Sequence, residues 1–330
     1  MISIREVAKL AGVSAATVSR VINGSAKVSP EKRDRVLRAI EETKFVPNEV
    51  ARTLFKGSAK IIGLIIPSIR NPYFTELAAR LGELATEQGY RLFLSNVGYD
   101  ITRERMALQM LESMNADGAI LVPGCREDRS SLEQFSIPLV VVDSDCDGPA
   151  DSYIYCDYYQ GAQMAMAHLT ACGCGKIVCI RGPQNTFSGQ SRFAGYQDYC
   201  EAHGIAQHVV DCDYDFDAGL AMTEELLQRY PDVDGILACN DIVAISTYKI
   251  LHKRKISVPD QIQLIGFDDI SLSSLISPEL TTIKQPLDEM AKMAMERVLN
   301  QGATEERGGR HILPVSLIVR ETTRRKNENG

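Results

Sequence analysis

Residues 4–23 read IREVAKLAGVSAATVSRVIN and contain two short helical patterns separated by a tight turn. Ser3 and Glu6 have the spacing of a capping box, in which each side chain satisfies a free amide of the other residue at a helix start. Gly12 suits the left-handed conformation that ends a helix and lets the chain reverse. Ser14 can then cap a second helix, so the stretch predicts a helix, a turn and a helix.

A third helix is predicted to begin at Ser29-Pro30-Glu31, where a capping residue, a proline and an acidic side chain follow one another. The second helix turns Val18 and Val21 inward. The apolar positions expected on the first and third helices are Val7, Ala8, Leu10 and Ala11, then Val36, Leu37 and Ile40. Two short helices braced by a third form a helix-turn-helix, whose second helix fits the major groove of DNA. The alternative is a generic three-helix bundle with a solvated basic face.

The charge of the chain is divided unevenly. The whole chain has 36 Lys and Arg against 43 Asp and Glu, and the net charge of −7 by itself argues against a nucleic-acid binder. Residues 1–60, however, carry 12 basic and 6 acidic side chains, a net of +6, which leaves −13 for the remainder. Such an asymmetry suggests that the basic end meets a polyanion while the acidic body does something else.

Length and composition predict a cytoplasmic protein of two to three domains. The 330 residues are 45% hydrophobic, which is ample for packed cores. No apolar stretch approaches the roughly 18 to 20 residues that span a bilayer, and the N-terminus has no secretory pattern. The nine scattered cysteines are typical of reduced thiols, and their spacing to the five histidines does not favour a metal site.

The stretch over residues 4–23 resembles the DNA-binding headpiece of the LacI/GalR family of bacterial transcription regulators. Its hydroxyl and amide side chains suit phosphate oxygens, which position a module without reading sequence. Arg20 is the main base-reading candidate because a guanidinium can bind O6 and N7 of guanine together, whereas Ala15 and Ala16 can only touch thymine methyl groups. The DNA contacts expected from this headpiece are Ser14, Ala15, Ala16, Thr17, Ser19, Arg20 and Asn23.

Residues 47–54, PNEVARTL, resemble the hinge segment of the same family. Pro47 favours an extended entry, and Asn48 can cap a short helix after it. Because a helix of about eight residues is not stable alone in water, we expect it to fold only with DNA and a partner hinge. The resemblance implies that Leu54 inserts between base steps in the minor groove; the alternative is a linker residue packed on the body. The DNA contacts expected from the hinge are Asn48, Ala51 and Leu54.

From Ile61 onwards, short apolar runs alternate with amphipathic helical stretches, which predicts buried parallel strands in an α/β fold. Two consecutive sets of such units imply two doubly wound lobes. Ligands in these sheets bind outside the carboxyl ends of the strands. The predicted strands are 61–67, 90–96, 118–123 and 139–143 in the first set, and 176–181, 209–212, 235–240 and 263–268 in the second.

Polar and aromatic side chains follow these predicted strands. Carboxylates, amides and one guanidinium can pair with vicinal hydroxyls, and aromatic faces suit the C–H surface of a sugar. Each residue also has a structural alternative: a helix cap for Asn71, turns for Asp143 and Asp268, and core packing for the aromatic rings. The candidate effector contacts are Asn71, Tyr73, Phe74, Asp143, Arg192, Phe216, Asn240, Asp268 and Gln285.

Motifs in the body are similar to effector-domain motifs of the LacI/GalR regulators, whose bodies share the fold of periplasmic sugar-binding proteins. These motifs are RFAG at 192–195, GFDD at 266–269 and TTIKQP at 281–286. The resemblance covers nearly the whole chain, and the candidate site looks most like that of ribose repressors and ribose-binding proteins. It implies an arginine after Asp143, but Ser144 stands there and Asp145 adds a carboxylate. An altered sugar is therefore plausible, and sucrose repressors are also similar in the hinge and in residues 281–286.

The resemblance also implies a domain organisation. It comprises a headpiece at 1–46, a hinge and linker at 47–60, a first lobe at 61–157 and 286–312, and a second lobe at 158–285 and 313–330. The chain would cross between the lobes near Asp157, Gln285 and Leu313, which allows hinge closure about a cleft. The polar tail at 324–330 lacks leucine heptads, so a two-fold homodimer rather than a tetramer is expected.

The function implied by the resemblance is repression of a carbohydrate operon, with operator DNA released when a sugar binds between the lobes. Within the same family, dependence on a corepressor or a phosphocarrier protein stays open, and a free-standing sugar-binding module is a further alternative. The sequence contains no phosphate loop, nucleophile elbow, zinc-protease motif or dinucleotide fingerprint, so neither an enzyme nor a bound cofactor is expected.

Overall fold

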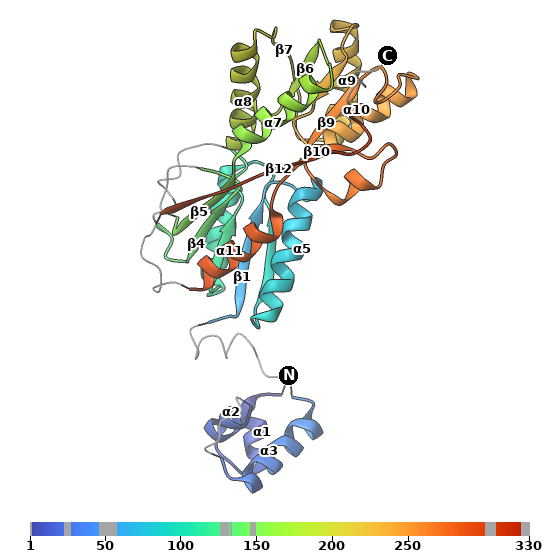
Figure 1. Cartoon of the computed structure of the whole chain (residues 1–330). Helices are drawn as coiled ribbons and strands as arrows, with labels where there is room; N and C mark the ends of the chain where they lie inside the picture. The colour runs from blue at the N-terminus through green and yellow to red at the C-terminus, as the bar shows by residue number, and fades with distance from the viewer. Residues whose placement is uncertain are drawn as a thin grey trace. The chain divides into compact units, whose positions relative to one another are not determined.

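The computed structural model describes residues 2–22, 28–45, 58–125, 132, 134–145, 150–300 and 308–324 (Figure 1). The chain divides into two compact units, Met1–Ala59 and Lys60–Gly330. Each unit has a hydrophobic core of its own. Within the described ranges, the helices are too short or too polar to cross a membrane.

The first unit contains α1 (Ile4–Ala11), α2 (Ala15–Ile22) and α3 (Pro30–Thr43). The predicted capping box is present, since Ser3 N donates to Glu6 Oε2 at 2.6 Å and Glu6 N donates to Ser3 Oγ at 3.4 Å. Gly12 takes a left-handed φ of 63° after α1. Ser14 Oγ accepts a hydrogen bond from Thr17 N at 3.2 Å at the start of α2. The predicted helix, turn and helix are confirmed.

The headpiece core differs from the prediction at two leucines. Its buried residues are Val7, Ala8, Ala11, Val18, Val21, Val36 and Ala39. Leu10 and Leu37 are 52% and 51% exposed, so these two predicted apolar positions lie outside the core. Ala39 shares a face with Val36 because residues three apart are neighbours on a helix, whereas consecutive residues diverge. Ser29 precedes α3, but among the described residues its side chain makes no capping hydrogen bond.

The body is built on two six-stranded sheets. The first sheet has the order β11-β5-β4-β3-β1-β2, and all its strand pairs are parallel. Its strands are almost fully buried at β1, β3, β4 and β5, as expected where helices cover both faces of a sheet. The strands are β1 (Ile61–Ile66), β2 (Arg91–Asn96), β3 (Gly118–Leu121), β4 (Leu139–Val142), β5 (Ser152–Cys156) and β11 (Gly309–Leu313).

The second sheet repeats this plan, with the order β12-β10-β9-β8-β6-β7. Its pairs are parallel except that β12 runs antiparallel to β10. The chain passes from one sheet to the other between β5 and β6, between β10 and β11, and between β11 and β12. The strands are β6 (Ile177–Arg181), β7 (His208–Asp211), β8 (Gly235–Leu237), β9 (Gln263–Asp268), β10 (Thr281–Lys284) and β12 (Ser316–Ile318).

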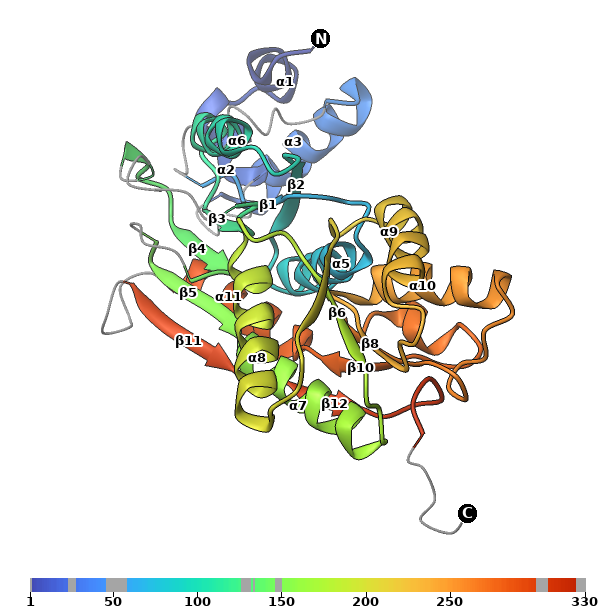
Figure 2. The same ribbon diagram turned by 90° about the horizontal axis from the view of Figure 1, so that it is seen from above.

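Helices cover both sheets. In the first lobe, α11 packs against α5 and against β3, β4 and β5, while α6 packs against β1 and β3. In the second lobe, α7 packs with α8 and α9 packs with α10, and Figure 2 shows these two pairs on opposite sides of the second sheet. The helices are α5 (Pro72–Glu87), α6 (Ile101–Ser113), α7 (Tyr158–Ala171), α8 (Phe187–His203), α9 (Phe216–Arg229), α10 (Asp241–Lys253) and α11 (Leu287–Leu299).

The two doubly wound lobes predicted from the sequence are confirmed, but four strands were missed. The strands β5, β10, β11 and β12 were not predicted as strands. The strand β11 has an alternating burial pattern, and β12 has only three residues, so neither forms a continuous apolar run. The predicted strand over 235–240 ends earlier, at Leu237, because Asn240 caps α10.

Candidate functional site

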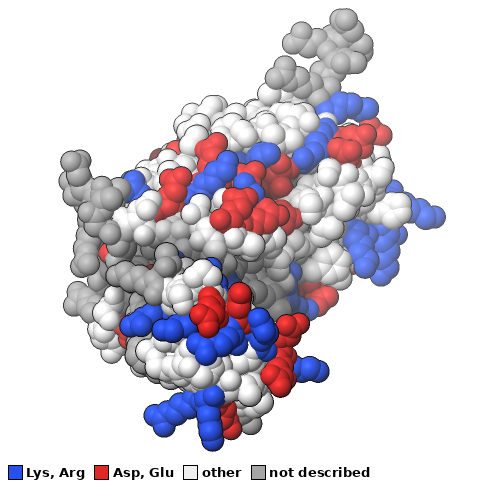
Figure 3. All heavy atoms as spheres, turned by 90° about the horizontal axis from the view of Figure 1, so that it is seen from below, with Lys and Arg blue, Asp and Glu red and all other residues white. Residues whose placement is uncertain are grey.

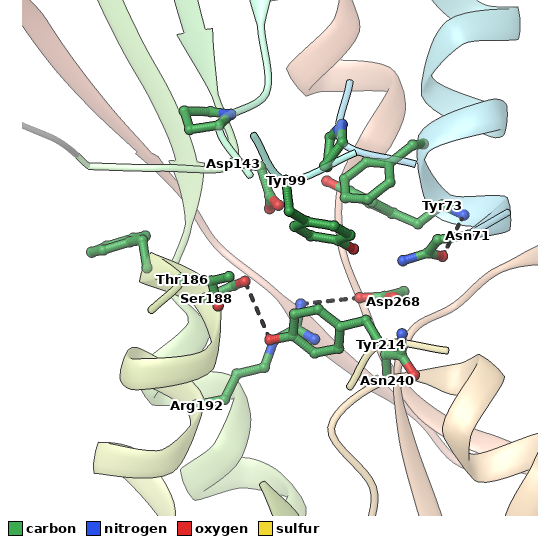
Figure 4. Close-up of a pocket in the computed structure, with 14 residues that line it drawn as sticks. Asn71, Tyr73, Tyr99, Asp143, Thr186, Ser188, Arg192, Tyr214, Asn240 and Asp268 are labelled. Atoms are coloured by element: carbon green, nitrogen blue, oxygen red, sulfur yellow. Dashed lines mark hydrogen bonds and ion pairs between the residues drawn. The ribbon is translucent and has the colours of Figure 1, made fainter. Parts of the chain in front are cut away.

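A cavity that opens to solvent lies between the two sheets (Figure 4), and its empty volume, solvent-open space included, is about 430 Å³. The residues that line the cavity lie at the carboxyl ends of the strands, in the turns that follow and in the N-terminal parts of α5 and α8, where ligands of doubly wound sheets bind. The first lobe contributes Pro67, Asn71, Tyr73, Phe74, Tyr99, Pro123 and Asp143, and the second contributes Thr186, Phe187, Ser188, Arg192, Tyr214, Asn240 and Asp268.

Asp143 and Asp268 occupy equivalent places in the two lobes. Asp143 directly follows β4, and Asp268 is the last residue of β9. These strands hold the same position in the order of their sheets. Both residues have positive φ, 65° and 118°, a conformation that is uncommon for residues other than glycine and clusters at functional sites. The two turns therefore present one carboxyl group from each lobe to the same cavity.

Arg192 on α8 is the guanidinium of this cavity. Its Nη2 donates to Asp268 Oδ1 at 3.0 Å, and its Nη1 donates to the carbonyl oxygen of Cys239 at 2.5 Å. The guanidinium carbon lies 3.8 Å from the centroid of the Phe267 ring, a cation–π contact. Its Nε is buried without a hydrogen-bond partner among the described residues. An unpaired buried donor is costly, so this atom calls for a hydrogen-bond acceptor.

Asn71 and Asn240 are helix caps that also line the cavity. Asn71 Oδ1 accepts from Tyr73 N at 3.1 Å at the start of α5, and Asn240 Oδ1 accepts from Val243 N at 2.9 Å at the start of α10. Capping uses the amide oxygen and leaves the amide nitrogen as a donor. The Nδ2 of Asn240, a residue only 1% exposed, has no partner in the described part of the chain. Asn240 can therefore cap α10 with its amide oxygen and still have its amide nitrogen available as a hydrogen-bond donor.

Gln285 lies behind the cavity wall and braces it. Its Nε2 donates to Asp268 Oδ1 at 2.8 Å, and its Oε1 accepts from the hydroxyl of Tyr73 at 3.1 Å. Gln285 is not among the residues lining the cavity, although it was predicted as an effector contact. This side chain instead joins Tyr73 of the first lobe to Asp268 of the second.

A third buried carboxyl group, that of Asp241, holds the turn next to Asp268. Its Oδ2 accepts from Ile270 N at 3.0 Å and from Ser273 Oγ at 2.6 Å, and its Oδ1 accepts from Thr282 Oγ1 at 2.5 Å. Gly266 makes this approach possible, because a Cβ at that position would lie 2.1 Å from Asp241 Oδ1. The GFDD and TTIKQP motifs thus meet through Asp241, a link that their separation in the sequence does not show.

Burial raises the pKa of both cavity carboxyl groups. It raises the pKa of Asp143 to about 7, against the opposing effect of a hydrogen bond from the hydroxyl of Tyr158. It raises the pKa of Asp268 to about 6, opposed by Arg192 and Gln285. Removal from water disfavours the charged form of a carboxyl group, and only Asp268 has a guanidinium against it. Asp143 is therefore the less well compensated of the two.

The aromatic part of the cavity was only partly predicted. Tyr73 and Phe74 line it, and their rings form an edge-on pair 5.4 Å apart. Phe216 does not line it; the ring of Phe216 instead lies 5.3 Å from Lys249 Nζ. Tyr214, two residues earlier, lies in the cavity. The lining residues that the prediction missed are Pro67, Tyr99, Pro123, Thr186, Phe187, Ser188 and Tyr214. Applying the strand-end rule to β2, β6 and β7 would have nominated most of them.

The predicted DNA contacts of the headpiece gather at the start of α2 and along its surface. Ser14, Ala16 and Arg20 are exposed. Ala15, Thr17 and Ser19 are partly exposed, and Thr17 Oγ1 lies 2.9 Å from Ser14 Oγ. Asn23, Asn48, Ala51 and Leu54 lie outside the described residues. Figure 3 shows Lys and Arg side chains interspersed with Asp and Glu. The face seen in that view therefore carries charges of both signs.

A helix-turn-helix unit followed by a two-lobed body with a cavity is the architecture of a ligand-responsive DNA-binding regulator. Residues 3–48 match the family model for bacterial regulatory proteins of the lacI family, and residues 166–323 match that for a periplasmic binding protein-like domain. The chain is 36% identical to the ribose operon repressor of Halalkalibacterium halodurans over 325 residues, 98% of each chain. It is 33% identical to the ribose operon repressor of Bacillus subtilis over 332 residues, 99% of this chain and 100% of the other. The chain therefore belongs to the LacI family of bacterial transcriptional regulators.

Solved structures agree with this assignment. A lac repressor dimer bound to operator and the anti-inducer ONPF matches with a TM-score of 0.85 and 26% identity over 97% of this chain and 98% of that one. A complex of the regulator CelR with cellobiose matches with a TM-score of 0.71 and 30% identity over 98% and 100%. A LacI-type regulator from Alkaliphilus metalliredigens in complex with D-xylulofuranose matches with a TM-score of 0.71 and 31% identity over 80% and 99%.

Proposed function

We propose that this regulator is a homodimeric, cytoplasmic repressor of a carbohydrate operon that leaves its operator when a sugar binds in the cavity between the lobes. The observation that carries the proposal is the pair of buried donors, Asn240 Nδ2 and Arg192 Nε, which have no partner among the described residues and line or adjoin one cavity. Buried donors of this kind call for an acceptor, and hydroxyl oxygens of a sugar supply one.

The other wall of the cavity suits the same ligand. Asp143 and Asp268 can accept hydrogen bonds from hydroxyl groups, and Asn71 can donate one. The rings of Tyr73, Phe74, Tyr99 and Tyr214 can cover the C–H surface. The sugar-bound relatives CelR and the Alkaliphilus regulator support this class of ligand.

The DNA side of the proposal rests on the headpiece. Arg20 reads a base in the major groove, while Ser14, Thr17, Ser19 and Asn23 contact phosphates and Ala15 and Ala16 contact thymine methyl groups. Asn48, Ala51 and Leu54 contact the minor groove from the hinge. The similarity to the operator-bound lac repressor dimer supports these roles and the two-fold assembly. In this function the protein acts by binding and carries out no catalysis.

The sugar acts by favouring one arrangement of the lobes. It can weaken operator binding only by its differential affinity for the two arrangements, typically about 1 to 3 kcal/mol of coupling. In the structure, the two lobes make contacts that a change in their arrangement would break or alter. Tyr158 of the second lobe donates to Asp143 of the first, and Arg70 lies 3.9 Å from Asp215 and 3.6 Å from Asp217 across the cleft.

Operator binding measured with and without sugars tests the proposal. A thermal-shift screen with the full chain against pentoses, hexoses, disaccharides and their phosphates identifies the ligand, since a ligand at 100 times its Kd adds about 2.7 kcal/mol of stability. The ligand that raises the Tm should lower operator affinity about 5- to 150-fold. If no carbohydrate changes operator affinity, or if a purine tightens it, the proposal is wrong.

A further inference from the structure

The cavity contains more negative than positive charge. Its lining includes two carboxyl groups, Asp143 and Asp268, but a single guanidinium, Arg192. Arg192 forms its ion pair with Asp268, at 3.0 Å. Among the described residues, Asp143 forms no ion pair, and its hydrogen bond comes from the neutral hydroxyl of Tyr158. A buried carboxylate without a counter-charge is costly, so the free protein leaves one end of the cavity short of a cation.

The surroundings of Asp143 do not supply that cation. The titratable groups that face it are Tyr158, Arg192, Asp268, Cys156, Tyr73 and Tyr99. Only Arg192 is basic, and it is already engaged with Asp268. Behind Asp268, the buried carboxyl of Asp241 adds further acidic character.

The neighbouring Asp145, in the same turn, has the positively charged partner that Asp143 lacks. Asp145 accepts from Arg310 Nε at 2.7 Å and from the Tyr155 hydroxyl at 3.2 Å, and it does not line the cavity. Ser144, between the two acids, is buried and brings no charge. The contrast isolates Asp143 as the cavity acid that has no charged partner of its own among the described residues.

Aromatic rings stand at the same end of the cavity. Figure 4 shows the ring of Tyr99 beside the carboxyl group of Asp143, with Tyr73 close by, while Arg192 and Asn240 lie toward the opposite side. Ring faces attract cations, and a carboxylate flanked by rings is a common setting for an ammonium group. On the opposite side, Arg192 Nε and Asn240 Nδ2 have no hydrogen-bond partner within the described ranges, and such N–H donors suit neutral oxygen acceptors.

We propose that the effector is an amino sugar, a polyhydroxylated molecule with one ammonium group, which binds with its ammonium against Asp143 and Tyr99 and its hydroxyls against Arg192 and Asn240. This inference rests on the proposed function of the cavity and specifies the class of sugar. The raised pKa of Asp143 supports it, because burial without a cation disfavours the carboxylate that an ammonium would stabilise.

Matched pairs of sugars that differ in one group test the inference. The full chain is titrated by calorimetry at pH 7 with D-glucosamine, D-galactosamine, D-mannosamine and 3-amino-3-deoxy-D-ribose. Each titration is paired with the hydroxyl counterpart, and the hexosamines are also paired with their neutral N-acetyl forms. We expect at least one amino sugar to bind at least tenfold more tightly than both neutral partners and to release the operator.

Variants of the protein then test whether the ammonium group of the sugar binds at Asp143. Asp143→Asn keeps the size of the side chain, an acceptor for Tyr158 and tolerance of positive φ, so the fold should survive. It should remove the tenfold preference for the amino member of the pair, because the affinity for the amino member should fall much further than the affinity for the neutral member. Asp145→Asn is the matched control, two residues away and outside the cavity, and should keep the preference. Ser144→Arg, which adds a guanidinium beside Asp143, should reduce the preference as well, and its melting temperature checks its fold.

The outcomes separate this inference from the proposed function. If a neutral sugar binds as tightly as its amino counterpart in every pair and releases the operator, the proposed function stands and the amino-sugar inference is wrong. If Asp143→Asn and Asp145→Asn keep the preference equally, Asp143 is not the ammonium site and the inference is likewise overturned. If neither amino nor neutral carbohydrates bind or change operator affinity, both fail.

Discussion

Glu76, on α5 of the first lobe, accepts two hydrogen bonds from Ser271 of the second lobe, from its backbone N at 2.9 Å and its hydroxyl at 2.8 Å. Ser271 begins the short helix η2 (Ser271–Ser274), whose Ser273 donates to the buried Asp241 beside the cavity. A single carboxylate thus joins the first lobe to the turn that follows Asp268. This contact is formed only when the two lobes are close together.

Glu76→Ala should therefore weaken sugar binding by favouring the open arrangement. Loss of two hydrogen bonds to a carboxylate costs on the order of 1 to 3 kcal/mol, or about 5- to 150-fold in Kd. Isothermal titration of the sugar identified by the screen measures this effect. Glu83→Ala is the control, because Glu83 lies on the same helix but pairs with Arg80 inside the first lobe. Equal losses in the two variants would show that the link between the lobes has no special role.

Arg192→Met should abolish the response to sugar while operator affinity without sugar stays within about threefold. The substitution removes Nε, which has no partner among the described residues, and leaves Asp268 buried without its guanidinium, which costs on the order of 3 to 5 kcal/mol of stability. The double variant Arg192→Met, Asp268→Asn should recover most of the lost Tm but none of the response. Arg254→Ala, which removes a surface ion pair with Glu224, is the control. A normal sugar response in Arg192→Met would exclude this residue from the site.

Asn240→Ser should separate capping from binding. Serine caps helices nearly as well as asparagine, so the start of α10 and the Tm should change little. Its shorter side chain removes the Nδ2 donor from the cavity, and sugar affinity should fall by about 1 to 2 kcal/mol, or roughly 5- to 30-fold. Calorimetry measures the sugar affinity of the variant, and thermal unfolding measures its Tm. A large loss of Tm with unchanged affinity would mean that Asn240 is a cap alone.

The stability of the ligand-free protein should depend on Asp143 through pH. Its folded pKa, about 7, lies above the ordinary aspartate value of about 3.8. The contribution of Asp143 to stability is therefore complete below about pH 4 and is lost as the pH rises through 7. Asp143→Asn should therefore stabilise the protein at pH 8 relative to the wild type, by on the order of 1 to 4 kcal/mol, and have little effect at pH 4. Urea unfolding at both values measures this difference. The same small effect at both pH values would show that the folded pKa is not raised.

Arg20→Ala should lower affinity for the specific operator by about 1 to 3 kcal/mol and relax selectivity at one base pair. Arg38→Ala, an equally exposed loss of one charge on α3, is the matched control. Gel-shift titrations on specific and random duplexes over a range of salt concentrations measure the operator affinity and the selectivity for the operator. If Arg20→Ala weakens binding to the two duplexes equally, the residue contacts phosphate and does not read a base.

The helix-turn-helix could be predicted from the sequence because its signals are local. The Ser3 and Glu6 box, the left-handed Gly12 and the Ser14 cap each involve residues at most four apart, and all were found as expected. The buried strands could be recognised for a related reason, since helices on both faces leave continuous apolar runs such as IIGLII in β1. Edge strands such as β11 carry no such run and were missed.

The composition of the cavity depends on tertiary structure. Residues at or after the ends of eight strands meet only because the order of each sheet brings β2, β1, β3 and β4, or β7, β6, β8 and β9, side by side. The sequence could nominate Asp143, Arg192, Asn240 and Asp268, but it could not show that Tyr214 rather than Phe216 faces the cavity, or that Gln285 braces Asp268 from behind. These outcomes are set by packing between residues far apart in the chain. Local sequence thus determined the DNA-binding unit and the lobes, whereas long-range packing decided which side chains face the ligand and which carboxylate is left without a cation.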